Sequence, residues 1–274
     1  MRLAISNIAW DTEEDPEVAK LLQTFRIDAI DIAPGKYFPV PAAAKDADIS
    51  RVKHWWLDRG IEITGMQGLL FGTTGLNLFG DSQSRQDMLE HLRAVCRIGG
   101  KLGATRLVFG SPKNRDRTGL NDEQALEQAV SFFRQLGDIA QEHGVIMCLE
   151  PNPVRYGANF MITSEETAKI VMAADHPAIR MQFDTGAVVI NGEQAETILA
   201  NHADLIGHIH LSEPGLAPLG DGDTDHAFMS KVLASHLPGK VASIEMVATT
   251  QEPHLVSIER ALSRAVALYR AIQV

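Results

Sequence analysis

Short apolar runs alternate with longer amphipathic segments along the whole chain. Runs of this length are typical of buried parallel strands, and the amphipathic segments between them are typical of surface helices. The longest helices are expected at residues 82–102, 122–143 and 252–271. We expect eight β-strands, at Leu3–Ile8, Ala29–Ile32, Glu62–Met66, Arg106–Phe109, Val145–Leu149, Ile179–Phe183, Leu205–Leu211 and Val241–Met246.

Several helical segments begin with residues that cap helix N-termini. A short polar side chain at the N-cap, Pro at the first helical position, and Glu or Gln three residues after the cap are the relevant signals. The expected starts are Asp15 with Pro16, Asn121 with Gln124, Thr163 with Glu166, and Asp225 after a glycine-rich turn.

The order of these elements predicts a single α/β domain over residues 1–274. No Pro/Ser-rich linker divides the chain, and eight strand–helix units close into a (β/α)8 TIM barrel when each crossover adds the next parallel strand. A doubly wound open sheet is the alternative. It would place a glycine-rich phosphate loop after the first strand, but Asn7–Asp11 has no G-x-G-x-x-G pattern.

Composition narrows the class of protein and of partner. The 274 residues are 45% hydrophobic and 22% charged, which suits a globular core and excludes disordered or collagen-like chains. Acidic residues outnumber basic ones by 35 to 25, so the formal charge of -10 would repel a nucleic acid. We therefore expect no nucleic-acid partner.

The two cysteines, Cys96 and Cys148, lie in apolar stretches and are expected to be small buried side chains in a reducing compartment. The N-terminal run lacks the basic and long apolar regions of a signal peptide, and no apolar stretch reaches the ~18 residues of a membrane span. We expect a cytoplasmic protein without a membrane partner.

Four consecutive expected strands end in a side chain that can ligate a metal. These side chains are Glu150, Asp184, His210 and Glu245. Parallel strands bring their carboxyl ends to one rim, with neighbours only ~5 Å apart, so the four side chains are expected to converge.

Three converging carboxylates without partners would repel one another, so they need a cation or shared protons. We expect one divalent metal ion, with Mn²⁺, Mg²⁺, Co²⁺ and Zn²⁺ all compatible with three carboxylates and one imidazole. The alternative is that Arg or Lys side chains at the rim pair with these acids.

Five motifs resemble those of the xylose-isomerase-like TIM barrel superfamily, and the resemblance covers nearly the whole chain. This superfamily includes sugar isomerases and epimerases, inosose dehydratases and, more distantly, endonuclease IV. In its ketose 3-epimerases, Glu, Asp, His and Glu at these strand ends hold one metal, which implies Glu150, Asp184, His210 and Glu245 here. The motifs are LEPN (149–152), QFDTG (182–186), GHIHLSE (207–213), PLGDGD (218–223) and SIEM (243–246).

The residues predict proton-transfer chemistry at a carbon next to a carbonyl. A metal chelated by a substrate carbonyl and its neighbouring hydroxyl acidifies the C–H between them and stabilises an enediolate. Glu150 and Glu245 flank the cluster and form the expected acid/base pair, and the resemblance implies that both are also ligands. The predicted activity is isomerisation or epimerisation of a sugar-like α-hydroxycarbonyl compound.

The sequence departs from the ketose 3-epimerases at two positions that hold sugar oxygens in that group. Ala187 replaces a His, and Leu216 replaces an Arg. The loop after the fourth strand carries Lys113, Arg115 and Arg117, which are expected either to bind an anionic group of the substrate or to form a solvated basic turn.

Further side chains at the same rim are candidates for substrate contact or for support of the ligands. Gln67 reaches a substrate hydroxyl or caps its strand, and Asn152 orients Glu150. His208 shares a face with His210 and lies one layer deeper, which favours a hydrogen-bonded supporting role. Glu213 contacts substrate or the adjacent loop.

Three other functions stay open. A metal-dependent dehydratase of an inosose or keto-sugar would share the proton abstraction and then expel a β-hydroxyl. An endonuclease IV-like hydrolase would need three metals, and a sugar-binding barrel would need no catalysis. Exposed barrel faces in this superfamily often dimerise, so a homo-oligomer is also an open alternative.

Overall fold

The computed structural model describes residues 1–270, and its strands form a closed parallel barrel in which each strand pairs with the next and β8 pairs with β1. The (β/α)8 TIM barrel expected from the alternating pattern is thereby confirmed. The strands are β1 (Arg2–Ser6), β2 (Ala29–Ile32), β3 (Glu62–Met66), β4 (Arg106–Phe109), β5 (Ile146–Leu149), β6 (Ile179–Asp184), β7 (Ile206–Ser212) and β8 (Val241–Glu245).

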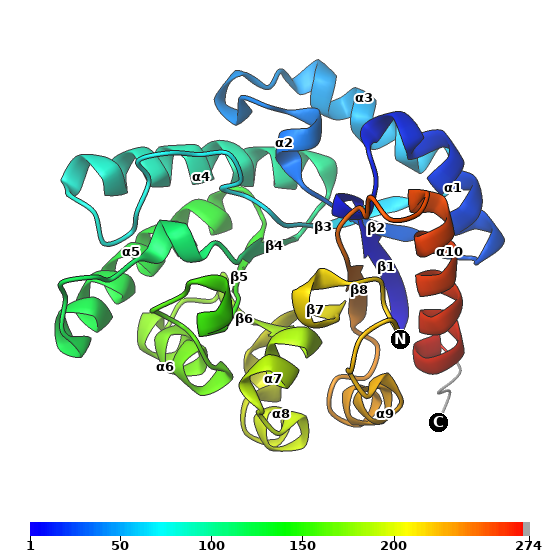
Figure 1. The fold of residues 1–274 in the computed structure, drawn as a ribbon. Coiled ribbons are helices and arrows are strands. Elements are labelled where there is room, and N and C mark those ends of the chain that lie inside the picture. Colours follow the sequence, from blue (N-terminus) through cyan, green and yellow to red (C-terminus); the bar gives the residue numbers. More distant parts are fainter. Residues whose placement is uncertain (271–274) are drawn as a thin grey trace.

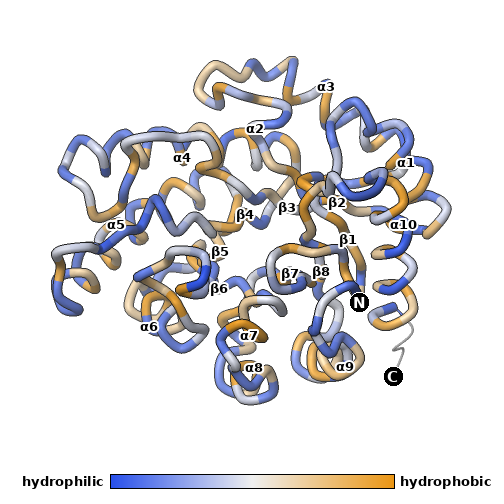
Figure 2. Tube along the Cα trace, viewed as in Figure 1, coloured by the Kyte–Doolittle hydropathy of each residue, from blue (hydrophilic) through white to orange (hydrophobic). Residues whose placement is uncertain are grey.

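The helices surround the strands as an outer layer (Figure 1). Hydrophobic and hydrophilic positions alternate along them (Figure 2), as expected where one face of each helix packs on the barrel. The helices are α1 (Asp15–Thr24), α2 (Pro34–Tyr37), α3 (Asp46–Leu57), α4 (Ser82–Leu102), α5 (Asp122–Glu142), α6 (Ser164–Ala174), α7 (Thr185–Asn191), α8 (Ala195–His202), α9 (His226–His236) and α10 (His254–Ala265).

The largest differences from the expected elements are at two element ends. β1 stops at Ser6 because Asn7–Ala9 forms a 3-10 turn, with the Ser6 hydroxyl accepting from the Ile8 N–H. The last helix begins at His254 and continues past Ala265 as a π-helical turn over Val266–Arg270. Residue 271, the expected end of this helix, lies outside the described residues.

The expected helix caps are confirmed at Asn121, Thr163 and Asp225, each of which accepts from a backbone N–H in the first turn. The expectation for Asp15 is corrected, because α1 begins at Asp15 itself. The Asp15 carboxylate instead accepts from the Trp10 ring nitrogen and the Tyr37 hydroxyl, both at 2.7 Å, so it does not cap the helix end.

Both cysteines are buried, and burial raises the pKa of the Cys96 and Cys148 thiols to about 12. They therefore remain protonated and pack as small apolar groups. No helix within residues 1–270 has the length and apolar character that crossing a membrane demands.

Strand register brings the carboxyl ends of the last strands together. Asp184 on β6 lies opposite His210 on β7, and Ser212 on β7 lies opposite Glu245 on β8. Alternate residues of a strand share a face, so His208, His210 and Ser212 all belong to one face of β7. This face and the neighbouring strand ends form the candidate metal centre.

Candidate metal centre

The four strand-end side chains expected to bind a metal converge in the structure. Glu150, Asp184, His210 and Glu245 each offer a ligand atom, and these atoms lie within 4.8 Å of one another. The His210 Nδ1 atom is 3.2 Å from Glu150 Oε1, 3.3 Å from Glu245 Oε2 and 3.9 Å from Asp184 Oδ2. All four residues are buried.

Glu150 is held from both its backbone and its side chain. Asn152 Nδ2 donates to Glu150 Oε2 at 3.1 Å, which is the orienting contact expected for Asn152. Arg115 Nη1 donates to the Glu150 carbonyl oxygen at 2.8 Å. A Cβ atom at Gly110 would overlap Glu150 Oε2, so the space for this carboxylate depends on a glycine at the end of β4.

Asp184 is oriented by a residue that the sequence did not identify. Ser212 Oγ lies 2.9 Å from both Asp184 carboxylate oxygens, and the Ala187 N–H donates to Oδ1 at 2.6 Å as part of the N-cap of α7. Ser212 follows His210 by two residues, so the alternation of β7 was the signal that could have located it.

Glu245 receives a hydrogen bond from Gln67, whose Nε2 donates to Glu245 Oε1 at 2.6 Å. The Gln67 Oε1 atom is buried and has no hydrogen-bond partner among the described residues. One end of this amide therefore orients a candidate ligand while the other remains available to accept a hydrogen bond.

No Lys or Arg forms an ion pair with the carboxylates of the cluster in the described part of the chain, and the nearby Arg115 guanidinium binds the backbone carbonyl of Glu150 instead. Within residues 1–270, His210 is the only basic side chain within 4.0 Å of the carboxylates of Glu150, Asp184 and Glu245. Burial and the charges of Glu245 and Glu150 raise the pKa of Asp184 well above its ordinary value. Burial would lower the pKa of His210, but the same two glutamates raise it instead.

The donor set fits a divalent cation. Three buried carboxylates and one imidazole supply hard oxygen ligands and one nitrogen, and a bound cation would remove the repulsion that raises the pKa of Asp184. The alternative in which Arg or Lys pairs with these acids does not occur in the described part of the chain.

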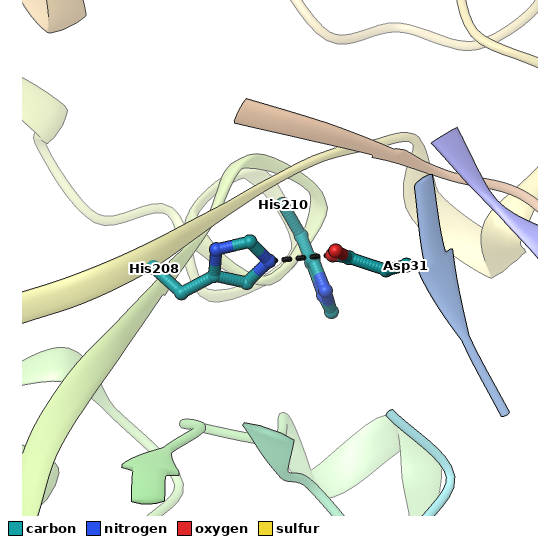
Figure 3. Close-up of side chains that lie close together, drawn as sticks. All are labelled: Asp31, His208 and His210. Carbon is teal, nitrogen blue, oxygen red and sulfur yellow. Dashed lines mark hydrogen bonds and ion pairs between the residues drawn. The ribbon is translucent and has the colours of Figure 1, made fainter. Parts of the chain in front are cut away.

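A second buried group lies directly behind His210 (Figure 3). His208 Nε2 is 2.6 Å from Asp31 Oδ2, and the His210 ring lies beside this pair. Burial would raise the pKa of Asp31, but His208 lowers it below its ordinary value. His208 thus has the supporting position expected for it, one layer below His210.

Asp31 is the second supporting residue that the sequence did not identify. Its carboxylate and the His210 ring offer atoms within 4.8 Å of each other, and His210 Nε2 is buried without a hydrogen-bond partner among residues 1–270. Asp31 therefore fixes the orientation of His208, and it acts on His210 only through its charge. Its position near the carboxyl end of β2, in an apolar strand, is the signal in the sequence that could have located it.

Of the three loop cations, Arg115 departs from both expected roles. Arg115 is fully buried and bonds to the Glu150 carbonyl and the Asn152 side chain, and burial lowers its pKa to about 10. It therefore supports the loop after β5 instead of facing an anionic group. Lys113 is exposed and Arg117 pairs with Asp122, so the loop is mainly a solvated turn.

Glu213 is bonded to the loop that follows β7. It is buried, with Oε1 accepting from the Gly220 N–H at 2.9 Å and contacting His226 Nε2 at 3.1 Å, while Oε2 accepts from the Thr224 N–H at 3.0 Å. Burial would raise its pKa, but His226 and Thr224 lower it to about 2. Of the two roles expected for Glu213, the structure favours the loop contact.

A cavity of about 680 Å³ opens onto the cluster, and Glu150, His210, Glu245 and Gln67 form part of its wall. Lys113 does not line it. The cavity therefore reaches three of the four candidate ligands and the free oxygen of Gln67.

Comparison with known proteins identifies the family. The family model described as "Xylose isomerase-like TIM barrel" matches residues 20–270. The chain belongs to this family. The resemblance noted from its motifs is confirmed.

Individual relatives are distant. The inosose dehydratase of Geobacillus thermodenitrificans is 20% identical over 223 residues, which cover 78% of this chain and 71% of the relative. A D-psicose 3-epimerase structure with D-tagatose from Clostridium cellulolyticum H10 is 19% identical, covers 99% of both chains and has a TM-score of 0.81. The IolI protein with a bound zinc atom is 15% identical, covers 100% of both chains and has a TM-score of 0.76.

Proposed function

We propose that this protein is a divalent-metal-dependent isomerase or epimerase of a sugar or sugar-derived α-hydroxycarbonyl compound. The observation that carries the proposal is the buried group of three carboxylates and His210, in which no Lys or Arg of the described residues forms an ion pair with the carboxylates. When bound there, the metal would polarise the substrate carbonyl and make the neighbouring C–H more acidic. The zinc-bound and epimerase relatives support this assignment.

Glu150 and Glu245 are the proposed acid and base. Their carboxylates approach His210 Nδ1 from two strands, β5 and β8, at 3.2 and 3.3 Å. One would take the proton from the substrate carbon and the other would return a proton to the enediolate. Asn152 and Gln67 restrict the rotation of these carboxylates, and Gln67 Oε1 is placed to accept from a substrate hydroxyl.

A second candidate is a metal-dependent dehydratase acting on an inosose or another keto-sugar. The name of the Geobacillus relative supports it, and the same base could begin the reaction. The two candidates differ after the first step, because a dehydratase expels a β-hydroxyl and an isomerase returns the proton.

The test measures deuterium exchange and product formation in D₂O with Mn²⁺-loaded protein and candidate keto-sugars and inososes. We expect metal-dependent C–H exchange that Glu150→Gln and Glu245→Gln each reduce by at least about 100-fold. The exposed Glu127→Gln variant on α5 is the control for charge removal. Wild-type turnover in both site variants would refute the mechanism, and loss of water from the substrate would favour the dehydratase.

A further inference from the structure

The cavity at the metal centre has two chemically different parts. Glu150, His210 and Glu245 form its polar wall. Most of the remaining wall is apolar and includes Ile8, Leu69, Phe71, Phe109, Leu216 and Val247. These residues come from loops or strand ends on several sides of the barrel, so the apolar surface is a property of the assembled rim.

The few other polar side chains in this wall already have partners. Lys36 Nζ donates to the carbonyl oxygens of Asn7, at 2.9 Å, and Trp10, which leaves one of its three N–H groups available. The Ser111 hydroxyl donates to Asn114. Of the cavity's side chains outside the candidate ligands, Gln67 offers the unpartnered acceptor, and it points to the metal cluster. Substrate hydroxyls that lie against the apolar part of the wall would find few groups there to replace their hydrogen bonds to water.

Leu216 is held in an unusual backbone conformation at this wall. Its φ is +55°, in the left-handed region that a bulky side chain rarely adopts. Two backbone hydrogen bonds maintain it, from the Leu216 N–H to Glu213 and from the Val247 N–H to the Leu216 carbonyl. Strained backbone conformations of this kind cluster at ligand-binding sites. The isobutyl group of Leu216 is therefore a candidate contact for the substrate.

The apolar wall continues into solvent at the mouth. Phe71, in the loop after β3, is 92% exposed although it lines the cavity, and Val247, after β8, is 43% exposed. Exposed apolar side chains that continue a cavity wall are typical of a ligand-binding surface. The exposed rings and methyl groups therefore extend the cavity outward from the metal centre.

We propose that the substrate carries an apolar substituent, such as an aryl or alkyl aglycone, beyond the α-hydroxycarbonyl group. The inference rests on the proposed function, because the metal centre would hold the α-hydroxycarbonyl end of the substrate at the bottom of the cavity. Phe71, Leu216 and Val247 contact the apolar substituent, and Gln67 accepts from the hydroxyl next to the carbonyl. A substrate with a free hydroxyl on every carbon is disfavoured.

The test uses three α-hydroxyketones that differ in the second substituent of the carbonyl carbon: hydroxyacetone, 2-hydroxyacetophenone and erythrulose. Binding to the Mn²⁺-loaded protein is measured by calorimetry. Displacement of water from the metal is measured by the relaxation rate of water protons. We expect the aryl compound to bind about 10- to 100-fold more tightly than hydroxyacetone, from burial of its ring, and erythrulose to gain no affinity. Equal binding of the aryl and methyl compounds overturns the proposal.

Two variants test the contact surface itself. Leu216→Asn places a polar side chain of similar size at the cavity wall, and Asn tolerates a positive φ, so the variant is expected to fold at least as stably. It should reduce the preference for the aryl compound at least about 5-fold, as should Phe71→Ser. The control is Phe228→Ser on α9, because Phe228 is 46% exposed and does not line the cavity.

The outcomes separate this inference from the proposed function. Metal-dependent binding of hydroxyacetone with no gain from the aryl ring refutes the inference alone. If the aryl compound binds more tightly than hydroxyacetone but with the same affinity in the presence and absence of Mn²⁺, the apolar site is supported and the metal-dependent function is refuted. If Phe71→Ser dissociates a dimer and leaves the aryl preference unchanged, a second copy of the chain covers this surface and the inference is overturned.

Discussion

Single side chains position each of the three candidate carboxylate ligands. Asn152 contacts Glu150, Ser212 contacts Asp184 and Gln67 contacts Glu245, each through a hydrogen bond of 2.6 to 3.1 Å. These contacts hold the carboxylates in a conformation that faces His210 before a cation binds. Preorganisation of this kind reduces the free energy that binding would otherwise spend on ordering the ligands.

Ser212→Ala is expected to weaken binding of Mn²⁺ about 10- to 100-fold, because Asp184 loses its hydroxyl donor. The measurement is titration of the apoprotein with Mn²⁺, monitored by electron paramagnetic resonance. Ser50→Ala, at an exposed serine on α3, is the control and should bind Mn²⁺ like the wild type. An unchanged affinity in Ser212→Ala would contradict a supporting role for Ser212.

Gly110→Ala tests the space around Glu150. The added Cβ would overlap Glu150 Oε2, so the carboxylate must move and the affinity for Mn²⁺ should fall. Gly35→Ala is the matched control, because a Cβ there meets nothing within 4 Å. If both variants bind Mn²⁺ with wild-type affinity, Glu150 is not confined as the structure indicates.

Among the elements, β7 and the loop after it make the largest contribution to the site. One face of β7 carries His208, His210 and Ser212, and the buried Glu213 fastens the adjoining loop through backbone N–H groups. The loop also places Leu216 against the cavity, so its conformation affects the shape of the binding site.

Glu213→Gln is expected to lower the free energy of unfolding by about 2 kcal/mol at pH 7, because charge-assisted hydrogen bonds are lost. The pKa of Glu213 is lowered from 4.5 to about 2 on folding, so its contribution is present above pH 4.5 and is lost as the pH falls toward 2. Urea unfolding from pH 7 to pH 3 should show the two proteins converging. A constant difference would show that the charge is not responsible.

For the whole molecule, the barrel collects acidic residues from strands far apart in the chain. Glu150, Asp184 and Glu245 contribute to the net charge of -10, and their concentration at one rim creates a candidate cation site from buried carboxylates that would otherwise repel one another. Folding of the apoprotein and binding of a divalent ion are therefore expected to be linked.

Addition of Mn²⁺ at 100 times its dissociation constant should stabilise the protein by about 2.7 kcal/mol, measured by thermal and urea unfolding and reversed by EDTA. Asp184→Asn should abolish most of this gain. The same variant is expected to be at least as stable as wild type in EDTA, since it removes one of three repelling carboxylates. Equal metal stabilisation of both proteins would exclude Asp184 as a ligand.

The apoprotein should also lose stability as the pH rises. The pKa of His210 is raised above 6.5 on folding, so the stability from its protonated form is complete below pH 6.5 and is lost as the pH passes the raised value. The raised pKa of Asp184 acts in the same direction above about pH 3.8. Unfolding in EDTA between pH 5 and 9 should show the decline, and saturating Mn²⁺ should suppress it.

The sequence by itself determined the barrel and the four candidate ligands, because both depend on local order. The periodicity of a strand depends on adjacent residues. Parallel strands bring their carboxyl ends to one rim, however the side chains between them pack. Glu150, Asp184 and Glu245 could therefore be singled out from their place at the ends of apolar runs.

Only the tertiary structure decided which other residues join the site. Gln67 contacts Glu245 across 178 positions and Asp31 contacts His208 across 177, so no local pattern relates them. Arg115 was expected at the mouth from its place in a loop, but burial depends on how that loop packs. Such contacts are set by the closure of the barrel, which brings side chains together only after the whole chain has folded.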